Sequence, residues 1–452
     1  MGGMNGGAVE NPERRRIFGL SPNVVWMGVV SFLNDLSSDM IFPFIPIFLT
    51  SVLGASLTFV GIVEGVADAT ASILKIASGW ISDKWQKRKR LVVIGYSLSA
   101  LAKPFLAAAM VPWHVLGVRF MDRVGKGTRD APRDALISVS TERQAFGRAF
   151  GFHRAMDTAG AAIGPLAAFA ILPLINQNYR TLFLLSFVAS FFAVLILVFF
   201  VREVRADDST GGGSVSVSIG QSIDTVSQSQ LRDGRVHRER RLVTDIVARP
   251  VERPSPPASR GRLAMLGAPF FLFLGVATLA SLGKASEAFL ILEARDVGVA
   301  LALIPILYFA FNTTAAILAT PFGALADRVG KRNTFVAGLL VFATVYFGLA
   351  FGASAKSIWF LFIAYGLYAA LTEGVGRAIV AGLVAEEVRA TAFGIYNAFT
   401  GLALLPASVL FGFLAQRYGS HVAFSYGAAL ALAAALSFLL LRRVFTIAPQ
   451  VR

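Results

Sequence analysis

The stretch GALADRVGKRNT at residues 323–334 decides the fold, because a similar stretch, GWISDKWQKRKR, stands at residues 79–90. Each stretch follows a long apolar segment, and the two lie about 240 residues apart. A second pair has the same separation, with AFGFHRAMD at 149–157 and AFGIYNAFT at 392–400. Matching segments in the same order predict two helical bundles related by an axis along the membrane normal.

The composition is that of a polytopic membrane protein. Of the 452 residues, 55% are hydrophobic and 15% charged, whereas soluble domains carry about a quarter charged residues. The absence of cysteine excludes disulfides and thiolate metal sites. The first twenty residues lack the apolar core of a secretory signal peptide. Apolar segments long enough to span a bilayer predict twelve helices, at 23–49, 57–81, 91–111, 113–138, 147–173, 181–201, 264–292, 302–326, 334–353, 357–384, 392–415 and 421–441.

The basic residues predict how these helices are oriented. Lysine and arginine gather in the even-to-odd loops and near the termini, as in 87–90, 328–332 and 442–443. By the positive-inside rule, these loops and both termini are cytoplasmic. The net charge of +15 therefore orients the protein in a lipid bilayer, and a nucleic-acid partner is not expected.

Residues 203–261 interrupt the pattern, because they are rich in Ser, Gly, Gln and Pro. This composition is typical of a flexible linker. The predicted fold class is an all-α membrane protein with twelve transmembrane helices in two pseudo-symmetric six-helix bundles. The expected parts are a cytoplasmic segment at 1–22, a bundle at 23–202, a cytoplasmic linker at 203–261, a second bundle at 262–441 and a cytoplasmic tail at 442–452.

With these two halves, the chain resembles the major facilitator superfamily, and the loop after the second and eighth helices carries most of the resemblance. Its signature, G-x-x-x-D-[RK]-x-G-[RK]-[RK], is complete in the second half, and Gln86 replaces the second glycine in the first half. The resemblance implies that the loops latch the cytoplasmic side shut when the cavity opens outward, with the first glycine allowing close helix packing. The matching residues are Gly323, Asp327, Arg328, Gly330, Lys331 and Arg332, and Gly79, Asp83, Lys84, Lys87 and Arg88.

The fifth helix carries a second motif of the superfamily, G-x8-G-x3-G-P. It stands at Gly151, Gly160, Gly164 and Pro165, with Ala168-Phe169 where a Gly-Gly pair is usual. The resemblance associates this motif with exporters and antiporters. In the fourth helix, Arg119 matches an arginine that lies in or beside the cavity of the family.

Three predicted helices of the first half each carry two ionisable residues that are four positions apart and near mid-membrane depth. The pairs are Asp35 with Asp39, Glu64 with Asp68, and His153 with Asp157. A charge left unpaired at the bilayer centre costs at least about 2.5–3.5 kcal/mol, so we expect these groups to face the bundle interior or an aqueous cavity. Carboxylic acids in such surroundings can carry protons near physiological pH. The expected residues for proton coupling and the cavity are Asp35, Asp39, Glu64, Asp68, Arg119, Asp122, Lys126, His153 and Asp157, with Glu287, Tyr368, Glu373, Arg377 and Asn397 from the second half.

The predicted function is a proton-coupled secondary transporter that exports a small solute. Its predicted location is the bacterial cytoplasmic (inner) membrane or a membrane derived from it. We expect a monomer without a cofactor, and no enzyme, because no nucleophile–base constellation is recognisable. Asp35, Asp39, His153 and Asp157 offer ligands for nickel, cobalt or iron. The segments SSDMIFPFIPIFL at 37–49 and LTEGVGRAIVAGLV at 371–384 are also similar to nickel-resistance and magnetosome iron permeases of the superfamily. A divalent metal is therefore slightly favoured as substrate.

Three alternatives stay open. A lipophilic organic cation or drug fits the acidic first helix and the apolar second half, and an organic anion fits Arg119 and Lys126. A membrane sensor or scaffold that does not transport predicts broken loop signatures and a neutral cavity, and the sequence has neither.

Overall fold

The computed structural model describes residues 17, 20–85, 87–141, 145–204, 265–385 and 388–441, and it is almost entirely helical there. In these ranges eleven spans are long and apolar enough to cross a membrane. A further helix, α5 (Pro112–Val139), is 28 residues long but too rich in charged residues to count by hydropathy. The prediction of twelve spans is thus confirmed by the described helices, with α5 as the charged one.

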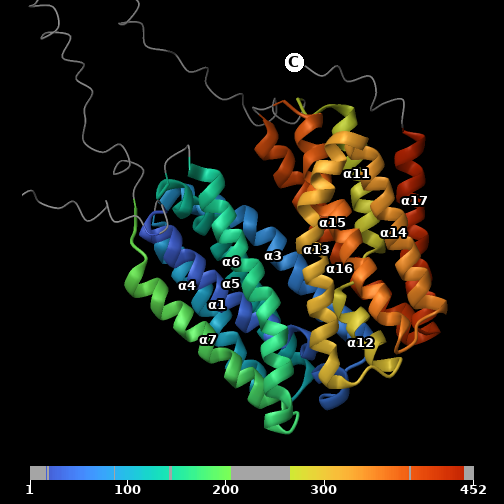
Figure 1. Cartoon of the computed structure of the whole chain (residues 1–452), viewed down its shortest axis with the longest axis horizontal. Coiled ribbons are helices and arrows are strands. Elements are labelled where there is room, and N and C mark those ends of the chain that lie inside the picture. The colour runs from blue at the N-terminus through green and yellow to red at the C-terminus, as the bar shows by residue number, and fades with distance from the viewer. Residues whose placement is uncertain are drawn as a thin grey trace, which may run out of the picture. The chain divides into compact units, whose positions relative to one another are not determined.

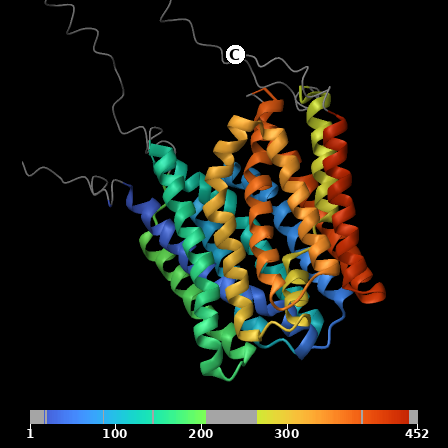
Figure 2. The same ribbon diagram turned by 45° about the vertical axis from the view of Figure 1, so that its right-hand side comes forward.

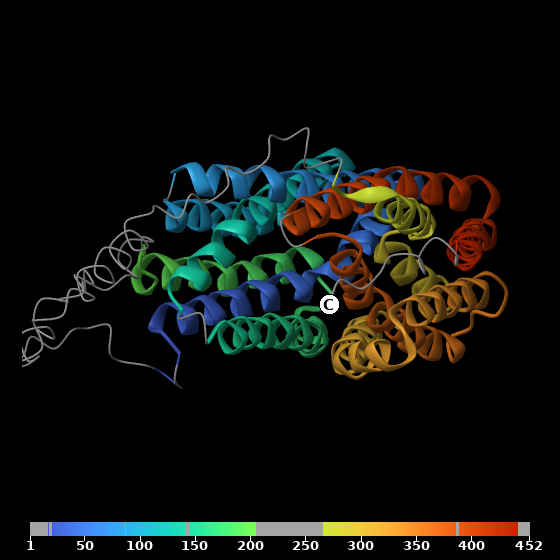
Figure 3. The same ribbon diagram turned by 90° about the horizontal axis from the view of Figure 1, so that it is seen from above.

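The helices form two groups that correspond to the two predicted halves (Figure 1). The first group consists of α1 (Pro22–Ile41), η2 (Phe42–Phe44), α2 (Ile45–Ile47), η3 (Phe48–Val52), α3 (Leu57–Trp85), α4 (Arg88–Ala107), α5, α6 (Phe146–Ile171), η5 (Leu172–Ile175) and α7 (Tyr179–Phe200). The second group consists of α11 (Gly267–Gly283), α12 (Glu287–Asp296), η7 (Leu301–Leu303), α13 (Ile304–Val329), α14 (Lys331–Phe351), α15 (Ser357–Leu383), α16 (Arg389–Tyr418) and α17 (Ser420–Leu440). Seen from above, the two groups stand side by side (Figure 3).

The predicted helix at 264–292 is not continuous. It divides into α11 and α12, and residues 284–286 separate them. The break has a local cause, because the side chain of Ser286 accepts a hydrogen bond from the backbone N–H of Ala288 (3.3 Å) and so caps the start of α12. The break exposes polar backbone in the interior of the protein, where side chains can satisfy it.

The outer part of the first span is distorted, as its two prolines predict. Phe42–Phe44 forms a 3₁₀ turn that contains Pro43, and Phe48–Val52 forms a π-helical turn after Pro46. Proline removes a backbone donor and crowds the preceding turn, which explains the irregular hydrogen bonding.

The two groups pack together through α3 and α16, whose close approaches extend from Leu57 with Gly412 to Ser72 with Gly401, and through α6 and α13. Small residues make this possible: a Cβ atom on Gly65 would lie 2.9 Å from the Cα of Leu405. Thr58 also donates to the side chain of Gln416 (2.6 Å). In Figures 1 and 2 the groups lie closest together at the lower end, where short turns connect each odd-numbered predicted span to the next one.

The opposite end carries the loop signatures, and the groups diverge there (Figure 1). Which side of the membrane this end faces stays a prediction. Most of the predicted linker at 203–261 and of the terminal segments at 1–22 and 442–452 lies outside the described residues.

Candidate functional site

A buried ion pair lies at the centre of the first group. Arg119 of α5 donates through Nη2 to both carboxylate oxygens of Glu64 in α3 (2.7 and 3.0 Å). The side chains of both residues are almost fully buried, with 6% and 4% exposed. Arg119 also lies 3.9 Å from a carboxylate oxygen of Asp122. The sequence predicts all three as site residues, and the structure brings them together.

This ion pair reaches the second group. The hydroxyl of Ser286, in the break between α11 and α12, donates to Glu64 Oε2 (3.4 Å). The backbone N–H of Ser286 donates to Ser408 of α16 (3.3 Å). The two groups are therefore hydrogen-bonded to each other through a carboxylate that already holds an arginine.

Asp35 and Asp39 are half-buried on α1. Asp35 accepts a hydrogen bond from the amide of its neighbour Asn34 (3.1 Å). Within the described part of the chain, no Lys, Arg or His nitrogen lies within 4.0 Å of either carboxylate. Lys126 is an electrostatic neighbour of both at longer range. These two acids are thus close to positive charge without being paired to it.

His153 and Asp157 of α6 belong to a hydrogen-bonded chain across three helices. His153 Nδ1 lies 3.5 Å from Asp157, and Nε2 bonds the hydroxyl of Ser31 in α1 (2.9 Å). Ser31 in turn bonds the hydroxyl of Tyr96 in α4 (2.9 Å). The guanidinium of Arg129 lies over the Tyr96 ring, 4.3 Å from its centroid. This chain can pass a proton between α6 and α4, because each member is both a donor and an acceptor.

The expected metal site is not formed. Among the described residues, no group of three or more His, Asp or Glu side chains is arranged to hold a metal ion. Of the predicted ligands, His153 lies 3.5 Å from Asp157, and its second imidazole nitrogen bonds the hydroxyl of Ser31. A divalent metal bound by these four residues therefore stays a prediction, and the described residues offer no formed site for it in this conformation.

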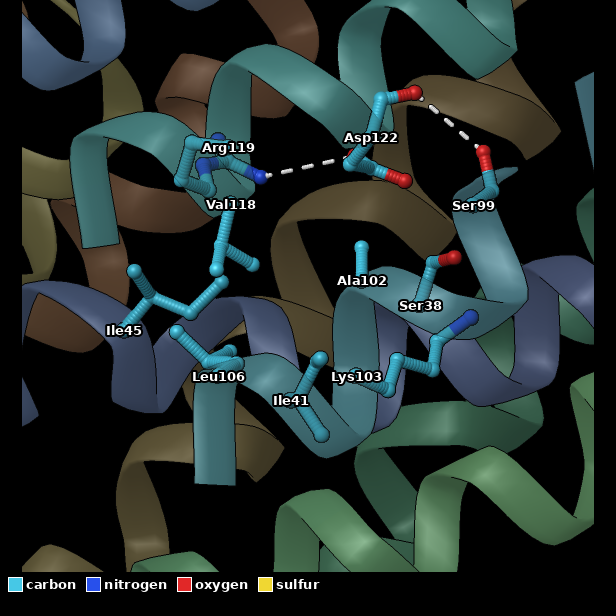
Figure 4. A pocket seen from close by; sticks show the side chains of 10 residues that line it. All are labelled: Ser38, Ile41, Ile45, Ser99, Ala102, Lys103, Leu106, Val118, Arg119 and Asp122. Atoms are coloured by element: carbon cyan, nitrogen blue, oxygen red, sulfur yellow. Dashed lines mark hydrogen bonds and ion pairs between the residues drawn. The ribbon is translucent and has the colours of Figure 1, made fainter. Parts of the chain in front are cut away.

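A small cavity lies inside the first group beside the Arg119–Asp122 contact (Figure 4). Its volume of about 30 Å³ equals roughly the share of one water molecule in the liquid. The buried Lys103 lines it and donates to Ser190, which in turn donates to Ser37 (2.8 Å). The lining residues are Ser38, Ile41, Ile45, Ser99, Ala102, Lys103, Leu106, Val118, Arg119 and Asp122.

The second group contains a cluster of aromatic rings that contact one another near the break. Ring centroids are 5.1 Å apart for Phe311 and Tyr365, 5.4 Å for Tyr365 and Tyr368, and 4.7 Å for Tyr368 and Phe342. Tyr308 joins this cluster through Phe311 (5.8 Å). Lys284, in the break, has Glu287, Glu373 and Tyr368 as electrostatic neighbours.

The remaining predicted residues are placed as follows. Asp68 of α3 is half-buried and has Arg123 and Glu64 as electrostatic neighbours. Glu373, Arg377 and Asn397 are exposed to solvent in this conformation. Among the described residues, Arg377 and Asn397 form no hydrogen bond or ion pair with the Glu64–Arg119 pair.

The loop signature is partly described. Gly330 has φ +99°, a conformation that favours glycine, and it makes the turn between α13 and α14. Arg332 donates to the carbonyl of Leu439 at the end of α17 (2.9 Å). Asp327 and Arg328 are exposed, and a Cβ atom on Gly323 would meet nothing within 4 Å, so the predicted close packing at Gly323 is absent in this conformation.

In the first copy of the signature, the side chains of Gly79, Asp83 and Lys84 lie outside the described residues. The backbone N–H groups of Arg88 and Lys89 donate to the carboxylate of Glu203 (3.0 and 2.9 Å). Glu203 thus caps the start of α4, as a carboxylate does at a helix N-terminus.

The glycine motif of α6 packs against α1. A Cβ atom on Gly164 would lie 2.6 Å from the carbonyl oxygen of Leu36, and one on Gly160 would lie 3.0 Å from the Leu36 nitrogen. Gly151 has open space around it. Close packing is therefore found at Gly160 and Gly164 and not at Gly151. Pro165 follows directly inside α6.

Several residues of the site were not predicted. Ser31, Tyr96, Ser286, Ser408 and Tyr308 became visible only in the structure, because Ser and Tyr are common in membrane helices and their partners come from other helices. Lys284 is already visible in the sequence as one of the few charged residues of the second half, and a lysine inside an apolar run is costly unless it is paired.

The chain was compared with known proteins. The sequence pattern of the Major Facilitator Superfamily matches residues 27–283 and 270–450. An uncharacterised MFS-type transporter of Methanocaldococcus jannaschii is 32% identical over 426 residues, which cover 93% of this chain and 95% of that protein. An uncharacterised protein of Mycobacterium tuberculosis is 27% identical over 399 residues, covering 88% and 85%.

Solved structures with the same fold have low sequence identity. A POT family transporter in complex with a thioalcohol-conjugated peptide has a TM-score of 0.71 at 14% identity, covering 95% of this chain and 98% of that one. A bacterial homologue of the human lysosomal transporter Spinster, inward-facing and unoccupied, has a TM-score of 0.71 at 15% identity, covering 94% and 97%. At these identities the likeness concerns the fold alone.

Proposed function

The chain belongs to the Major Facilitator Superfamily and is a transporter rather than an enzyme; on this premise we propose that it exports a small solute in exchange for protons. The proposal concerns the coupling ion, the direction and the residues involved. Asp35 and Asp39 are the groups that bind and release the proton.

One observation carries the proposal: Asp35 and Asp39 lie half-buried in the middle of a membrane span, and no cation within 4.0 Å neutralises them among the described residues. An ionised carboxylate in such a place is costly unless it is paired or solvated. Protonation removes this cost, so each acid can alternate between a protonated state and a state that holds another cation or faces water. The unpaired state is what a proton carrier requires.

The neighbouring ion pairs have a different role. Glu64 is held by Arg119 and Ser286, so its carboxylate already has partners. Breaking this arrangement would leave a buried arginine without a partner, which is strongly unfavourable. We therefore assign proton exchange to α1 and the closure of the two bundles to the Glu64–Arg119–Ser286 contact.

The proposed direction of transport, export, rests on the glycine motif of α6. The resemblance associates this motif with exporters, and the close packing of Gly160 and Gly164 on α1 couples the motif to the helix that carries Asp35 and Asp39. A movement of α6 therefore shifts the environment of both acids. The His153–Ser31–Tyr96 chain connects the same two helices with α4 and offers a route for protons toward them.

The test uses inverted membrane vesicles that contain the protein, an imposed pH gradient and a pH-sensitive dye. Nickel, cobalt, ferrous iron, lipophilic cations and organic anions are added one at a time. We compare wild type with Asp35→Asn and Asp39→Asn, and Asp296→Asn serves as a control because Asp296 is exposed at the end of α12.

We expect one class of solute to collapse the gradient in wild type and in the control, and to fail in one or both α1 variants. The proposal is wrong if a labelled solute is transported equally by all four proteins without any movement of protons.

A further inference from the structure

Lys103 of α4 is a buried lysine without a carboxylate in direct contact. Only 3% of the residue is exposed. Within the described part of the chain, no carboxylate oxygen lies within 4.0 Å of its side-chain nitrogen. A lysine inside a membrane span is costly in its charged form unless it is paired or solvated. The charge of Lys103 therefore depends on the other polar groups that its nitrogen can reach.

The nitrogen of Lys103 has one direct hydrogen-bond partner, and the direction of this bond is fixed. Lys103 donates to the hydroxyl of Ser190 in α7, and Ser190 donates to Ser37 of α1 (2.8 Å). Ser37 in turn donates to the backbone oxygen of Ser186. Each hydroxyl has a single hydrogen, which the next acceptor already takes, so Ser190 can only accept from Lys103. An ammonium group has two more N–H groups, and these have no acceptor among the described residues.

The small cavity described above joins Lys103 to Asp122 of α5. Both side chains line it, together with Ser38 of α1, and in Figure 4 the ends of these three side chains gather at one side of the cavity. The carboxylate of Asp122 also lacks a direct hydrogen bond in the described part of the protein. Its nearest cations, Arg119 and Arg123, lie at 3.9 Å, which is longer than a hydrogen bond.

The cavity meets the requirements of a site for one water molecule. Its volume of about 30 Å³ is sufficient, and a buried water typically makes about three hydrogen bonds to polar groups of the protein. Three such groups line this cavity: the amine of Lys103, the carboxylate of Asp122 and the hydroxyl of Ser38. They include a donor, an acceptor and a group that serves as either.

From this arrangement we propose that Lys103 is a second residue that binds and releases a proton, and that a water in the cavity connects it to Asp122. In the charged form, the ammonium donates to Ser190 and to the water, and the water donates to the carboxylate. In the neutral form, the amine still donates to Ser190, and its lone pair accepts from the water. Both forms are thus hydrogen-bonded, as proton exchange requires. The inference rests on the proposed function and adds a residue to it.

The proton has a defined path. It passes from an N–H bond of Lys103 to the water, and the water gives one of its own protons to the carboxylate of Asp122. An amine, the water and a carboxylic acid remain, so the two charges disappear together. The side chain of Asp122 is 23% exposed, whereas Lys103 is buried, and release to solvent therefore occurs at Asp122. Through Arg119 and Glu64, Asp122 is also connected to the contact between the two bundles.

The charged groups around Lys103 come from two helices. α5, which packs against α4, places Asp122 and Arg129 near it, and α1 places Asp35 and Asp39 there. α7 also packs against α4, but the ionisable residues of α7 are confined to its first turn. Proton binding on α1 therefore changes the charge around Lys103, and each site influences the other.

The test follows the protonation of Lys103 itself, by solid-state ¹⁵N NMR of the full-length protein in lipid with labelled lysine side chains. The chain has nine lysines, and the signal of Lys103 is the one that Lys103→Met removes. Asp122→Asn removes the carboxylate, and Ser38→Ala removes one partner of the water. Asp296→Asn is the matched control, because Asp296 is exposed at the end of α12, and the exposed Lys356 is the internal reference.

We expect the signal of Lys103 to change from the ammonium to the amine position as the pH is raised through the physiological range. The signal of Lys356 should stay at the ammonium position. Asp122→Asn should move the midpoint by at least about one pH unit toward lower pH, because the charged form loses its counter-charge. Ser38→Ala should move the midpoint by a smaller amount, and Asp296→Asn should leave it unchanged, with the same elution on gel filtration for all proteins.

The proposal is overturned if Lys103 stays an ammonium at every pH at which the protein remains folded. It is also overturned if the midpoint is the same in Asp122→Asn and Asp296→Asn. If Asp122→Asn does not fold, an unchanged midpoint in Ser38→Ala overturns the connection through water. These outcomes leave the proposed function standing as long as an α1 variant abolishes proton exchange in the vesicle assay. If Lys103 titrates as expected while no solute moves protons, the proposed function fails and the proton site at Lys103 remains.

Discussion

Replacing Glu64 by Gln should destabilise the protein strongly, because it leaves the guanidinium of Arg119 without its main partner. Only 6% of the Arg119 side chain is exposed, so water cannot take over the role of the carboxylate. Removing one member of a buried ion pair typically costs about 3–5 kcal/mol. Asp122 lies 3.9 Å from the same guanidinium and offsets part of the loss, so we expect a value near the lower end, about 3 kcal/mol.

The double variant Glu64→Gln/Arg119→Met separates this effect from a general loss of packing. It removes the unpaired charge together with its partner, and a buried pair replaced by apolar groups of similar volume is often nearly neutral. The double variant should therefore be more stable than Glu64→Gln alone. Ser286→Ala, which removes only the 3.4 Å hydrogen bond to Glu64, should cost at most about 1 kcal/mol.

The assay is unfolding of the purified proteins in mixed micelles with increasing SDS, followed by circular dichroism. The coupling energy comes from the cycle of wild type, both single variants and the double variant. A loss below about 1 kcal/mol for Glu64→Gln, where a buried pair predicts several, would refute the assigned role of the ion pair. Additive losses in the cycle would refute it as well.

Two other features give independent predictions. Gly164→Ala should destabilise the protein by about 1–3 kcal/mol in the same unfolding assay, because the new Cβ would lie 2.6 Å from a backbone oxygen of α1. The control Gly151→Ala should change the stability by less than about 0.5 kcal/mol, because its Cβ would meet nothing within 4 Å. The chain has no cysteine, so spin labels on cysteines placed at the exposed Lys87 and Asn333 report the distance between the bundles without background. We expect this distance distribution to change with pH in wild type and not in Asp39→Asn; a distribution that responds to pH equally in both proteins would contradict proton binding at Asp39.

The fold could be predicted from the sequence to a large extent, because each signal involved is local. Apolar runs of membrane length and the repeat of the loop signature are enough to give twelve spans in two halves. The break at residues 284–286 was missed for the opposite reason. The apolar residues on either side read as one helix, and the cap by Ser286 depends on a hydrogen bond that only the folded backbone shows.

The site could be predicted only in part, because charge inside a membrane reveals the helices involved but not the partners. Glu64, Arg119 and Asp122 were named without the knowledge that they contact one another. The four-residue spacing of His153 and Asp157 places the two side chains 3.5 Å apart on one helix, and the described residues do not add a third ligand to them. The packing of Phe42 on Tyr308 is an aromatic contact between residues more than 260 positions apart, which no local pattern contains.

The arrangement of charges also indicates where coupling takes place. The Glu64–Arg119 pair and the His153–Ser31–Tyr96 chain join helices of the same bundle. Rocking one bundle against the other as a rigid body leaves these contacts unchanged. The contacts that must change are those between the bundles, such as the hydrogen bond from Ser286 to Glu64 and the packing of Phe42 on Tyr308. A proton or a solute can shift the equilibrium between two conformations only through groups whose surroundings differ in them. Coupling therefore has to act at the boundary, and Asp35 and Asp39 of α1 can respond there, because neither has a cation within 4.0 Å among the described residues.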